Sequence, residues 1–148
     1  MIKNLSTKLL IAFAILSFNT FQIKAQVPGE YRSIGTGMWA MPGIWEMYNG
    51  NTWVPAIDKP TYNSAKITIR SPHSVIVNSN DTIDETIVES GADFSVNAGS
   101  ILTINNGPGN DLILNAGSYG MSGNLVVFPG ATITGTGSLS YGAPSLHK

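Results

Sequence analysis

The stretch GADFSVNAGSILTI, residues 91–104, decides how this chain folds. It contains two copies of one unit, beginning at Gly91 and Gly99, in which a glycine is followed by a small residue, a spacer and an apolar residue. A third copy begins at Gly130 and a degenerate one at Gly117. Glycine permits the backbone angles of a tight corner, and a small residue after it lets a neighbouring layer approach closely. The unit therefore predicts short strands separated by tight corners.

Short runs with alternating apolar and polar residues fill the chain on both sides of this stretch. Each run has three to five residues and is bounded by Gly, Asn, Ser or Pro, which is typical of short strands. No window has the apolar spacing of an amphipathic helix. The runs cover residues 66–69, 74–77, 85–88, 93–96, 101–104, 112–114, 125–128 and 131–134.

The spacing of these runs distinguishes a solenoid from a sandwich. In alternate runs, Val75, Phe94, Leu112 and Ile133 follow one another at intervals of 19, 18 and 21 residues. A return of about 20 residues suits a solenoid, because each coil lays its strand on the equivalent strand of the coil before. We therefore expect an all-β fold, a short parallel β-solenoid of about three to four coils. A β-sandwich is the alternative, but no two of the runs are joined by a two-residue Asn-Gly turn of the kind that hairpins favour.

The first 25 residues have the pattern of a secretory signal peptide. Lys3 and Lys8 precede an apolar run at residues 9–18, too short for the roughly 20 residues that span a bilayer. The small residue Ala25 suits cleavage before Gln26. We therefore expect an exported protein, extracellular, at the cell surface or in the periplasm, with no membrane span after cleavage. The chain has no cysteine, which excludes a lipoprotein anchor and disulfides.

Removal of the signal leaves a mildly acidic chain. Residues 1–25 hold three of the eight basic residues and none of the nine acidic ones, so the remainder has a net charge of −4. A protein that binds duplex nucleic acid needs a basic face that neutralises phosphates. We therefore expect no nucleic-acid partner.

The segment before the repeats differs from them, because residues 26–64 hold all three tryptophans. Residues 45–53 predict a hairpin with Asn49-Gly50 at its tip and with Trp45, Met47 and Trp53 on one face. This segment is either a cap over the first coil, or a glycan platform. The platform would use Trp39, Trp45, Tyr48 and Trp53. The expected organisation is a signal peptide at 1–25, a Trp-rich hairpin or cap at 26–64, a solenoid at 65–140 and a tail at 141–148.

Residues 106–114 resemble one calcium-binding nonapeptide of the repeats-in-toxin family. Gly107, Gly109, Asp111 and Ile113 stand in matching places, whereas Asn106 replaces the first glycine. In that family the ions lie between tandem copies, and a single copy occurs here. A turn that enters a strand is the favoured interpretation, with calcium at Asp111 as the weaker one. We expect no cofactor.

Catalysis is not expected from the charged residues. A polysaccharide hydrolase needs two carboxylates about 5 to 10 Å apart on a long groove, and three or four coils provide little groove. The usual bases are limited to His73, in a turn, and His147, near the end, with no nucleophile elbow. We therefore predict that the protein is not an enzyme, and that one acidic cluster is a solvated face. The cluster contains Asp81, Asp84, Glu85, Glu89 and Asp93, with Arg70 and His73 nearby.

The chain also resembles a known class of proteins. Residues 31–33, 37–39, 45–50, 53 and 67–75 are similar to the amino-terminal segment of large secreted surface proteins of Gram-negative bacteria that use type IX secretion. The glycine units and residues 134–139 are similar to the β-solenoid found there. Such proteins continue to a sorting domain, which is absent before Lys148. The resemblance therefore implies a truncated member, a protein that leaves by another route, or one that stays in the periplasm.

The fold and this resemblance together predict a function. We expect a non-enzymatic module of the cell surface or exterior, acting as a structural spacer or adhesin-like scaffold. Its expected partners are glycans or neighbouring surface proteins. A carbohydrate-binding module that uses the Trp-rich segment is the alternative.

Overall fold

The computed structural model describes residues 25–141, and this part of the chain is all-β with one short 3-10 turn, η1 (Pro42–Ile44). The expected signal peptide and tail lie outside it, except for their residues Ala25 and Tyr141. The strands are short because corners interrupt them every few residues. They are β1 (Glu30–Ser33), β2 (Gly37–Met38), β3 (Trp45–Tyr48), β4 (Trp53–Pro55), β5 (Lys66–Ile69), β6 (Ser74–Val77), β7 (Asp81–Ile83), β8 (Thr86–Val88), β9 (Asp93–Val96), β10 (Ile101–Ile104), β11 (Leu112–Leu114), β12 (Ser118–Met121), β13 (Asn124–Val127), β14 (Ile133–Gly135) and β15 (Ser138–Tyr141).

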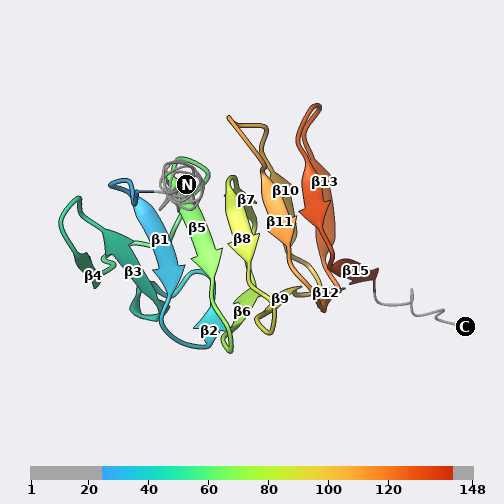
Figure 1. The fold of residues 1–148 in the computed structure, drawn as a ribbon. Helices are drawn as coiled ribbons and strands as arrows, with labels where there is room; N and C mark the ends of the chain where they lie inside the picture. Colours follow the sequence, from blue (N-terminus) through green and yellow to red (C-terminus); the bar gives the residue numbers. More distant parts are fainter. Residues whose placement is uncertain (1–24, 142–148) are drawn as a thin grey trace, which may run out of the picture.

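The strands form three sheets, which wind into a β-solenoid of about four turns (Figure 1). The seven-stranded sheet has the order β4-β3-β1-β5-β8-β11-β14, the five-stranded sheet the order β2-β6-β9-β12-β15, and the three-stranded sheet the order β7-β10-β13. Every pair outside β1, β3 and β4 is parallel, and β1 is itself parallel to β5. The expected parallel solenoid is therefore confirmed, and the sandwich alternative is wrong.

Alternation along each strand builds a continuous core between the sheets. Successive side chains of a strand point to opposite faces, so every second residue enters the core. In the seven-stranded sheet Ile67, Thr86, Leu112 and Ile133 stack in register from coil to coil. Burial of such columns, which are apolar except for Thr86, is the main force that holds the coils together. The largest fully buried side chains are Trp39, Trp45, Tyr119, Phe94, Ile67, Ile69, Ile83, Leu102, Ile104, Leu112, Leu114 and Val75.

The sequence-based grouping of the runs needs one correction. Val75 does pair with Phe94, and Leu112 with Ile133, but Phe94 and Leu112 belong to different sheets. Each complete coil has three strands, whereas the grouping assumed two. The observed return is 19 residues from Val75 to Phe94 and 26 from Thr86 to Leu112.

Two corners have the backbone that the glycine unit predicts. Gly91 and Gly99 have φ angles of 84° and 83°, a conformation that residues with a Cβ rarely adopt. The small residues after them, Ala92 and Ser100, are buried. These corners turn the chain from one sheet of the solenoid into the next.

The segment before the repeats contains the expected hairpin, but one of its faces was predicted wrongly. β3 and β4 pair in antiparallel fashion, and the Asn49 side chain accepts hydrogen bonds from the backbone N–H groups of Asn51 and Thr52 at the tip. Trp53 lies opposite Tyr48 in the register. It therefore shares the face of Tyr48 and is on the other side of the sheet from Trp45 and Met47, because successive side chains alternate.

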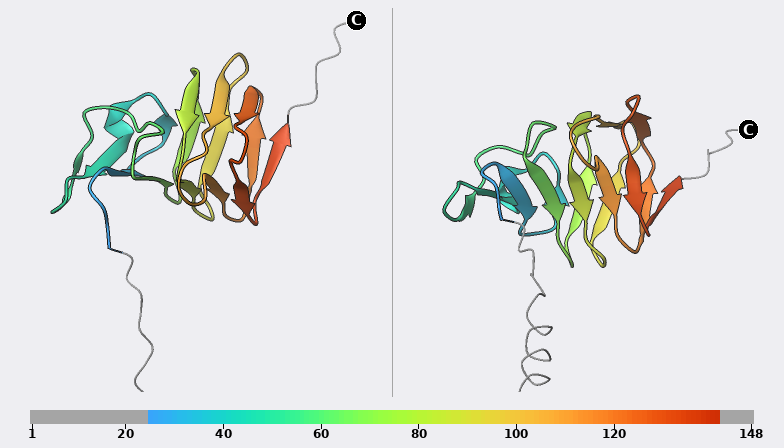
Figure 2. Two further views of the ribbon diagram at one scale, coloured as in Figure 1. Left: turned by 90° about the horizontal axis from the view of Figure 1, so that it is seen from above. Right: turned by 45° about the horizontal axis from the view of Figure 1, so that its top comes forward.

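The two ends of the solenoid differ. The hairpin β3–β4 extends the seven-stranded sheet beyond β1, as Figure 2 shows at one end of the stack. At the other end, β13, β14 and β15 each pair on one side only within the part of the chain that the structure describes. Val127 and Tyr141 there are 43% and 62% exposed. Residues 112–141 contain no Asp, Glu, Lys or Arg, the side chains that commonly protect an open sheet edge.

Candidate functional site

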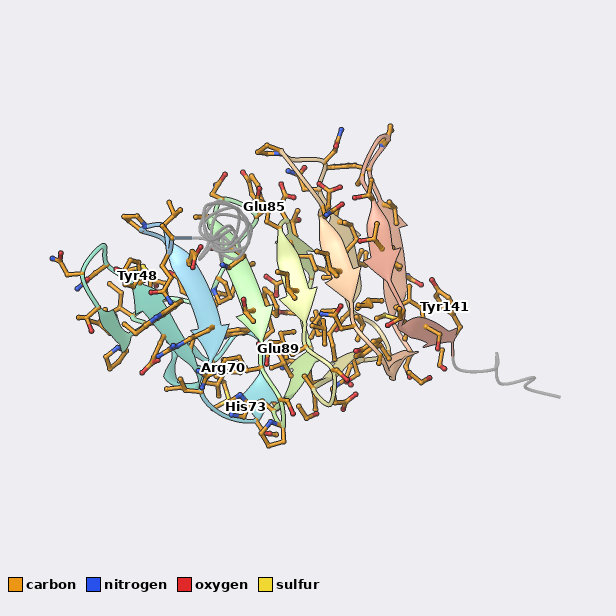
Figure 3. All side chains as sticks on the ribbon, viewed as in Figure 1. Tyr48, Arg70, His73, Glu85, Glu89 and Tyr141 are labelled. Carbon is orange, nitrogen blue, oxygen red and sulfur yellow. The ribbon has the colours of Figure 1, made fainter. Side chains whose placement is uncertain are left out.

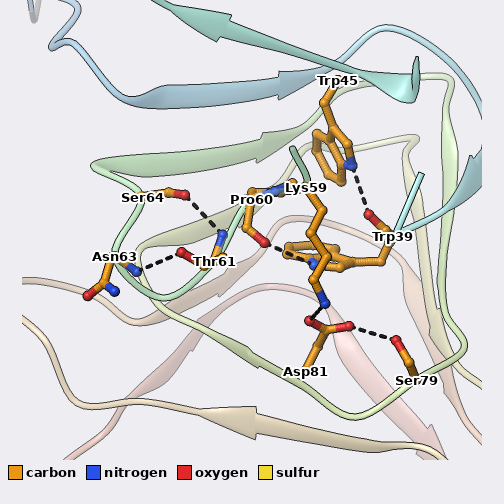
Figure 4. A network of polar contacts seen from close by, with 9 residues as sticks. All are labelled: Trp39, Trp45, Lys59, Pro60, Thr61, Asn63, Ser64, Ser79 and Asp81. Carbon is orange, nitrogen blue, oxygen red and sulfur yellow. Dashed lines mark hydrogen bonds and ion pairs between the residues drawn. The ribbon is translucent and has the colours of Figure 1, made fainter. Parts of the chain in front are cut away.

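Trp39 and Trp45 belong to the core and are inaccessible to a ligand. Both are 0% exposed, and their rings meet edge to face with centroids 5.1 Å apart. The indole of Trp45 donates a hydrogen bond to the Trp39 carbonyl oxygen at 3.0 Å, and that of Trp39 donates to Pro60 at 3.3 Å (Figure 4). A sugar ring needs an open aromatic face. The glycan platform is therefore wrong for these two residues.

An ion pair near these tryptophans holds the loop between β4 and β5 against the solenoid. Lys59 in this loop forms an ion pair with Asp81 at the start of β7, and Ser79 donates a second hydrogen bond to that carboxylate (Figure 4). Asp81 is buried, so the ion pair compensates its loss of hydration. The loop and the two tryptophans thus cover the first coil.

Tyr48 and Trp53 lie on the outward face of the seven-stranded sheet and are half-buried. Their ring centroids are 5.5 Å apart. The guanidinium of Arg32 lies over the Trp53 ring, 4.1 Å from its centroid, in a cation–π contact. Arg32 also donates two hydrogen bonds to one oxygen of Glu46, at 2.9 and 2.7 Å. Trp53 therefore positions a cation, a role that sequence reasoning missed.

A hollow of about 240 Å³ opens beside this contact on the outward face. It is lined by Glu30, Arg32, Trp53, Lys66, Thr68 and Arg70, and we call it the cationic groove. Parallel pairing places Arg32 directly beside Thr68. In the sequence, the spacing of Lys66, Thr68 and Arg70 by two residues was the available signal, since it puts all three on one face.

A second hollow lies beside the cationic groove, across the next coils. It measures about 230 Å³, and its lining includes Lys66, Glu85, Ile87, Asn110 and Ile113. Lys66 lines both hollows, so they meet at this residue. Ile87 and Ile113 pair directly in the register of β8 and β11 and form an outward apolar step.

Each cation of the groove is held by a neighbouring group. Lys66 donates to the buried carboxylate of Glu30 at 2.9 Å. Arg70 donates from Nε to the carbonyl oxygen of Ser33 at 3.0 Å. Within residues 25–141, no carboxylate lies within ion-pair distance of Arg70.

Ser33 and His73 are in contact in the way that a catalytic serine contacts its base, but the serine is not accessible to a substrate. Ser33 Oγ lies 2.8 Å from His73 Nδ1 and accepts the backbone N–H of Arg70. Figure 3 shows Arg70 and His73 close together. Ser33 is 0% exposed, so its hydroxyl cannot reach a substrate. The contact fixes the turn after β5.

The acidic residues singled out in the sequence do not gather at one site. Asp81 pairs with Lys59, Glu89 accepts the backbone N–H of Ser71, and Asp93 accepts the hydroxyl of Ser74. Asp81 and Asp84 are buried, so the prediction of a solvated acidic face is wrong for these two.

Asp111, the calcium candidate, has its oxygens occupied by protein donors. They accept hydrogen bonds from the backbone N–H groups of Gly107 and Thr132 and from the Thr132 hydroxyl, at 2.6 to 2.9 Å. A Cβ at Gly107 would lie 2.0 Å from the Asp84 carboxylate, so a larger residue here would have to displace that side chain. The contacts of Asp111 tie the turn before β11 to the next coil. Within the described chain, no group of three or more His, Asp or Glu residues is arranged to hold a metal ion.

Asp84 and Asp111 are two buried carboxyl groups that share a hydrogen bond. Burial raises the pKa of Asp84, and the Asp111 carboxylate raises it further, against hydrogen bonds from Glu85 and Asn105 that lower it. Burial also raises the pKa of Asp111, but its hydrogen bonds from Thr132, Gly107 and Asp84 outweigh that effect, so the pKa is lowered overall. The pair therefore holds one proton more tightly than the unfolded chain does, on Asp84.

We expect Asp84→Asn to remove a pH dependence of stability above about pH 4. Since the folded pKa of Asp84 is raised, its contribution is complete below the ordinary value near 3.8 and is lost as pH rises. Asn keeps the N–H donor towards Asp111 without titrating. The variant should therefore gain stability relative to the parent as pH rises, measured by urea unfolding at several pH values. A constant difference across this range would contradict the assignment.

No protein-family model, curated protein or solved structure matches the chain. In residues 25–141 no helix is long and apolar enough to cross a membrane. The fold and site together define a β-solenoid with one covered end and a cationic groove on its outward face.

Proposed function

We propose that the protein is a non-enzymatic module of an exported, cell-surface or extracellular protein, acting as a structural spacer or adhesin-like scaffold. The difference between the two ends of the solenoid is the observation that carries this proposal. One end is covered by the hairpin and two buried tryptophans. The other leaves three strand edges and apolar side chains without a covering layer among the described residues. A solenoid that is covered at one end only can be lengthened by coils without any change of cross-section.

The resemblance to surface proteins of type IX-secreting bacteria supports the same role. It rests on the Trp-rich opening and the glycine units, and both have structural roles here. Trp39 and Trp45 cover the first coil, and Gly91 and Gly99 form corners in the coils that follow it. A spacer of this kind has to keep its shape rather than change it, and parallel ladders in three sheets supply that rigidity.

Export can be tested by the mature amino terminus and the location of the protein. We expect mass spectrometry of protein from the source cells to show a chain that begins at Gln26. An antibody raised against the purified protein should label intact cells or the culture medium. A chain that keeps residues 1–25 and fractionates with the cytosol would contradict the proposal.

A carbohydrate-binding site can use only some of the residues that were predicted for it. Trp39 and Trp45 are buried, which leaves Tyr48 and Trp53 from the original four. Arg32 covers a face of the Trp53 ring, so a sugar cannot stack there. Any glycan site on this surface has to use the cations beside Trp53.

A further inference from the structure

The cationic groove concentrates the positive charge of an otherwise acidic chain. Residues 25–141 contain four Lys or Arg residues against nine Asp or Glu residues. Three of the four cations, Arg32, Lys66 and Arg70, line this one groove. The fourth, Lys59, is in the covering loop and is paired with Asp81. The groove is therefore the place on the described chain where an anion meets the least repulsion.

The cations are held in place before any ligand arrives. Arg32 is fixed by Glu46 and by the Trp53 ring, and Lys66 by Glu30. Arg70 is fixed through Nε, so its two terminal nitrogens take no part in that bond. A side chain that is already ordered loses little entropy on binding. Arg32 and Lys66 are paired with Glu46 and Glu30, which leaves Arg70 as the cation of the groove without an ion pair among the described residues. Glu89 lies next to it and Glu85 next to Lys66.

The other lining groups favour a hydroxyl-rich ligand. Glu30 accepts hydrogen bonds, as does Thr68, which can also donate one. Sugar hydroxyl groups both donate and accept, so they can pair with a lining carboxylate, whereas the phosphate oxygens of a nucleic acid only accept. The second hollow adds the amide of Asn110 and the apolar step of Ile87 and Ile113, against which the C–H face of a sugar can pack.

The volumes of the two hollows and their positions across successive coils favour a polymer as the ligand. Pockets for drug-sized ligands occupy about 300 to 1,000 Å³, and the cationic groove is smaller, at about 240 Å³. It lies beside the second hollow, with Lys66 lining both, across strands of successive coils. One unit of a chain can occupy the groove while the next follows the sheet face.

We propose that the cationic groove binds a polysaccharide with carboxylate groups, with Arg70 as the main contact for the carboxylate and Lys66 at the junction of the two hollows. This inference goes beyond the scaffold role and does not depend on it. Terminal nitrogens of arginine match the geometry of a carboxylate, and ion pairing at a half-exposed groove weakens with salt.

Affinity electrophoresis in native gels tests this proposal, with polygalacturonate, alginate or hyaluronan in the gel and dextran as the neutral polymer. We expect at least one acidic polymer to retard the protein, dextran to leave it unchanged, and added salt to reduce the retardation. Arg70→Gln should weaken binding about tenfold or more, and Arg70→Lys less. Thr68→Glu, which removes no cation but places a negative charge in the groove, should abolish binding. Lys148→Gln removes one positive charge from outside the described residues and should bind like the parent.

Each alternative result overturns the proposal. If no acidic polymer retards the protein, the groove is not a polysaccharide site. If Lys148→Gln weakens binding as much as Arg70→Gln, binding depends on net charge alone. If polyglutamate in the gel retards the protein equally, and Arg70→Gln reduces both effects equally, the site recognises acidic chains of any kind. Thermal melting of Arg70→Gln and Thr68→Glu provides the check that both variants are folded.

Discussion

Trp45→Ala should destabilise the protein by about 3–5 kcal/mol, the range for truncation of a buried aromatic side chain. Trp45 is 0% exposed, packs edge to face on Trp39 and donates a hydrogen bond to the Trp39 carbonyl. The substitution removes all three contributions and leaves a cavity beneath the hairpin. Urea unfolding, followed by circular dichroism, measures the loss of unfolding free energy.

Trp53→Ala is the matched control for this experiment. Trp53 is on the outward face, where it contacts Arg32 and Tyr48 rather than the core. We expect it to cost less stability than Trp45→Ala, and to weaken polysaccharide binding by releasing Arg32. Equal losses of stability from the two variants would contradict the assignment of Trp45 to a covering core.

Ile104→Ala should cost about 2–5 kcal/mol, whereas Val127→Ala should cost less than about 1 kcal/mol. The two residues are direct neighbours in the ladder between β10 and β13 and occupy the same inward position in successive coils. Ile104 is 0% exposed, but Val127 is 43% exposed because no coil covers it in the described chain. The comparison measures how much one covering coil contributes.

A large effect at Val127 would show that something covers this end in solution. Repeating the measurement at several protein concentrations distinguishes the cause. A cost that grows with concentration indicates association between copies. A cost that is independent of concentration and as large as that of Ile104→Ala would contradict an open end.

Much of the fold could be predicted from the sequence, because local pattern and corner chemistry agree. The run at residues 101–104 alternates strictly, and its glycine corner at Gly99 adopts the expected backbone. Besides β1 and β2 in the Trp-rich segment, three strands of the repeats were missed, for local reasons. Asp81 begins β7 in a polar stretch, Gly120 interrupts β12, and β15 alternates with serines that are typical of turns. When these strands are missed, the sequence predicts two strands in each coil, whereas each complete coil has three.

The candidate site was less predictable, because it depends on register. The loop from Asn49 to Thr52 has four residues, and a loop with an even number of residues pairs odd-numbered with even-numbered positions. Trp53 therefore lies opposite Tyr48 and away from Trp45. Arg32 is far from Lys66 and Arg70 in the sequence, and only the parallel pairing of β1 with β5 brings these cations together.

In-register stacking of the coils, on which both proposals depend, can be tested by engineered disulfides, because the chain has no cysteine of its own. Thr68 and Ile87 are direct partners of β5 and β8, about 4.8 Å apart, within reach of a disulfide. Ile113 is the next partner after Ile87, about 10 Å from Thr68 and beyond that reach. We predict that mild oxidation converts the double variant Thr68→Cys/Ile87→Cys to the intramolecular disulfide and leaves Thr68→Cys/Ile113→Cys as free thiols. Equal yields from the two variants, or a disulfide in the second alone, would contradict the stacking.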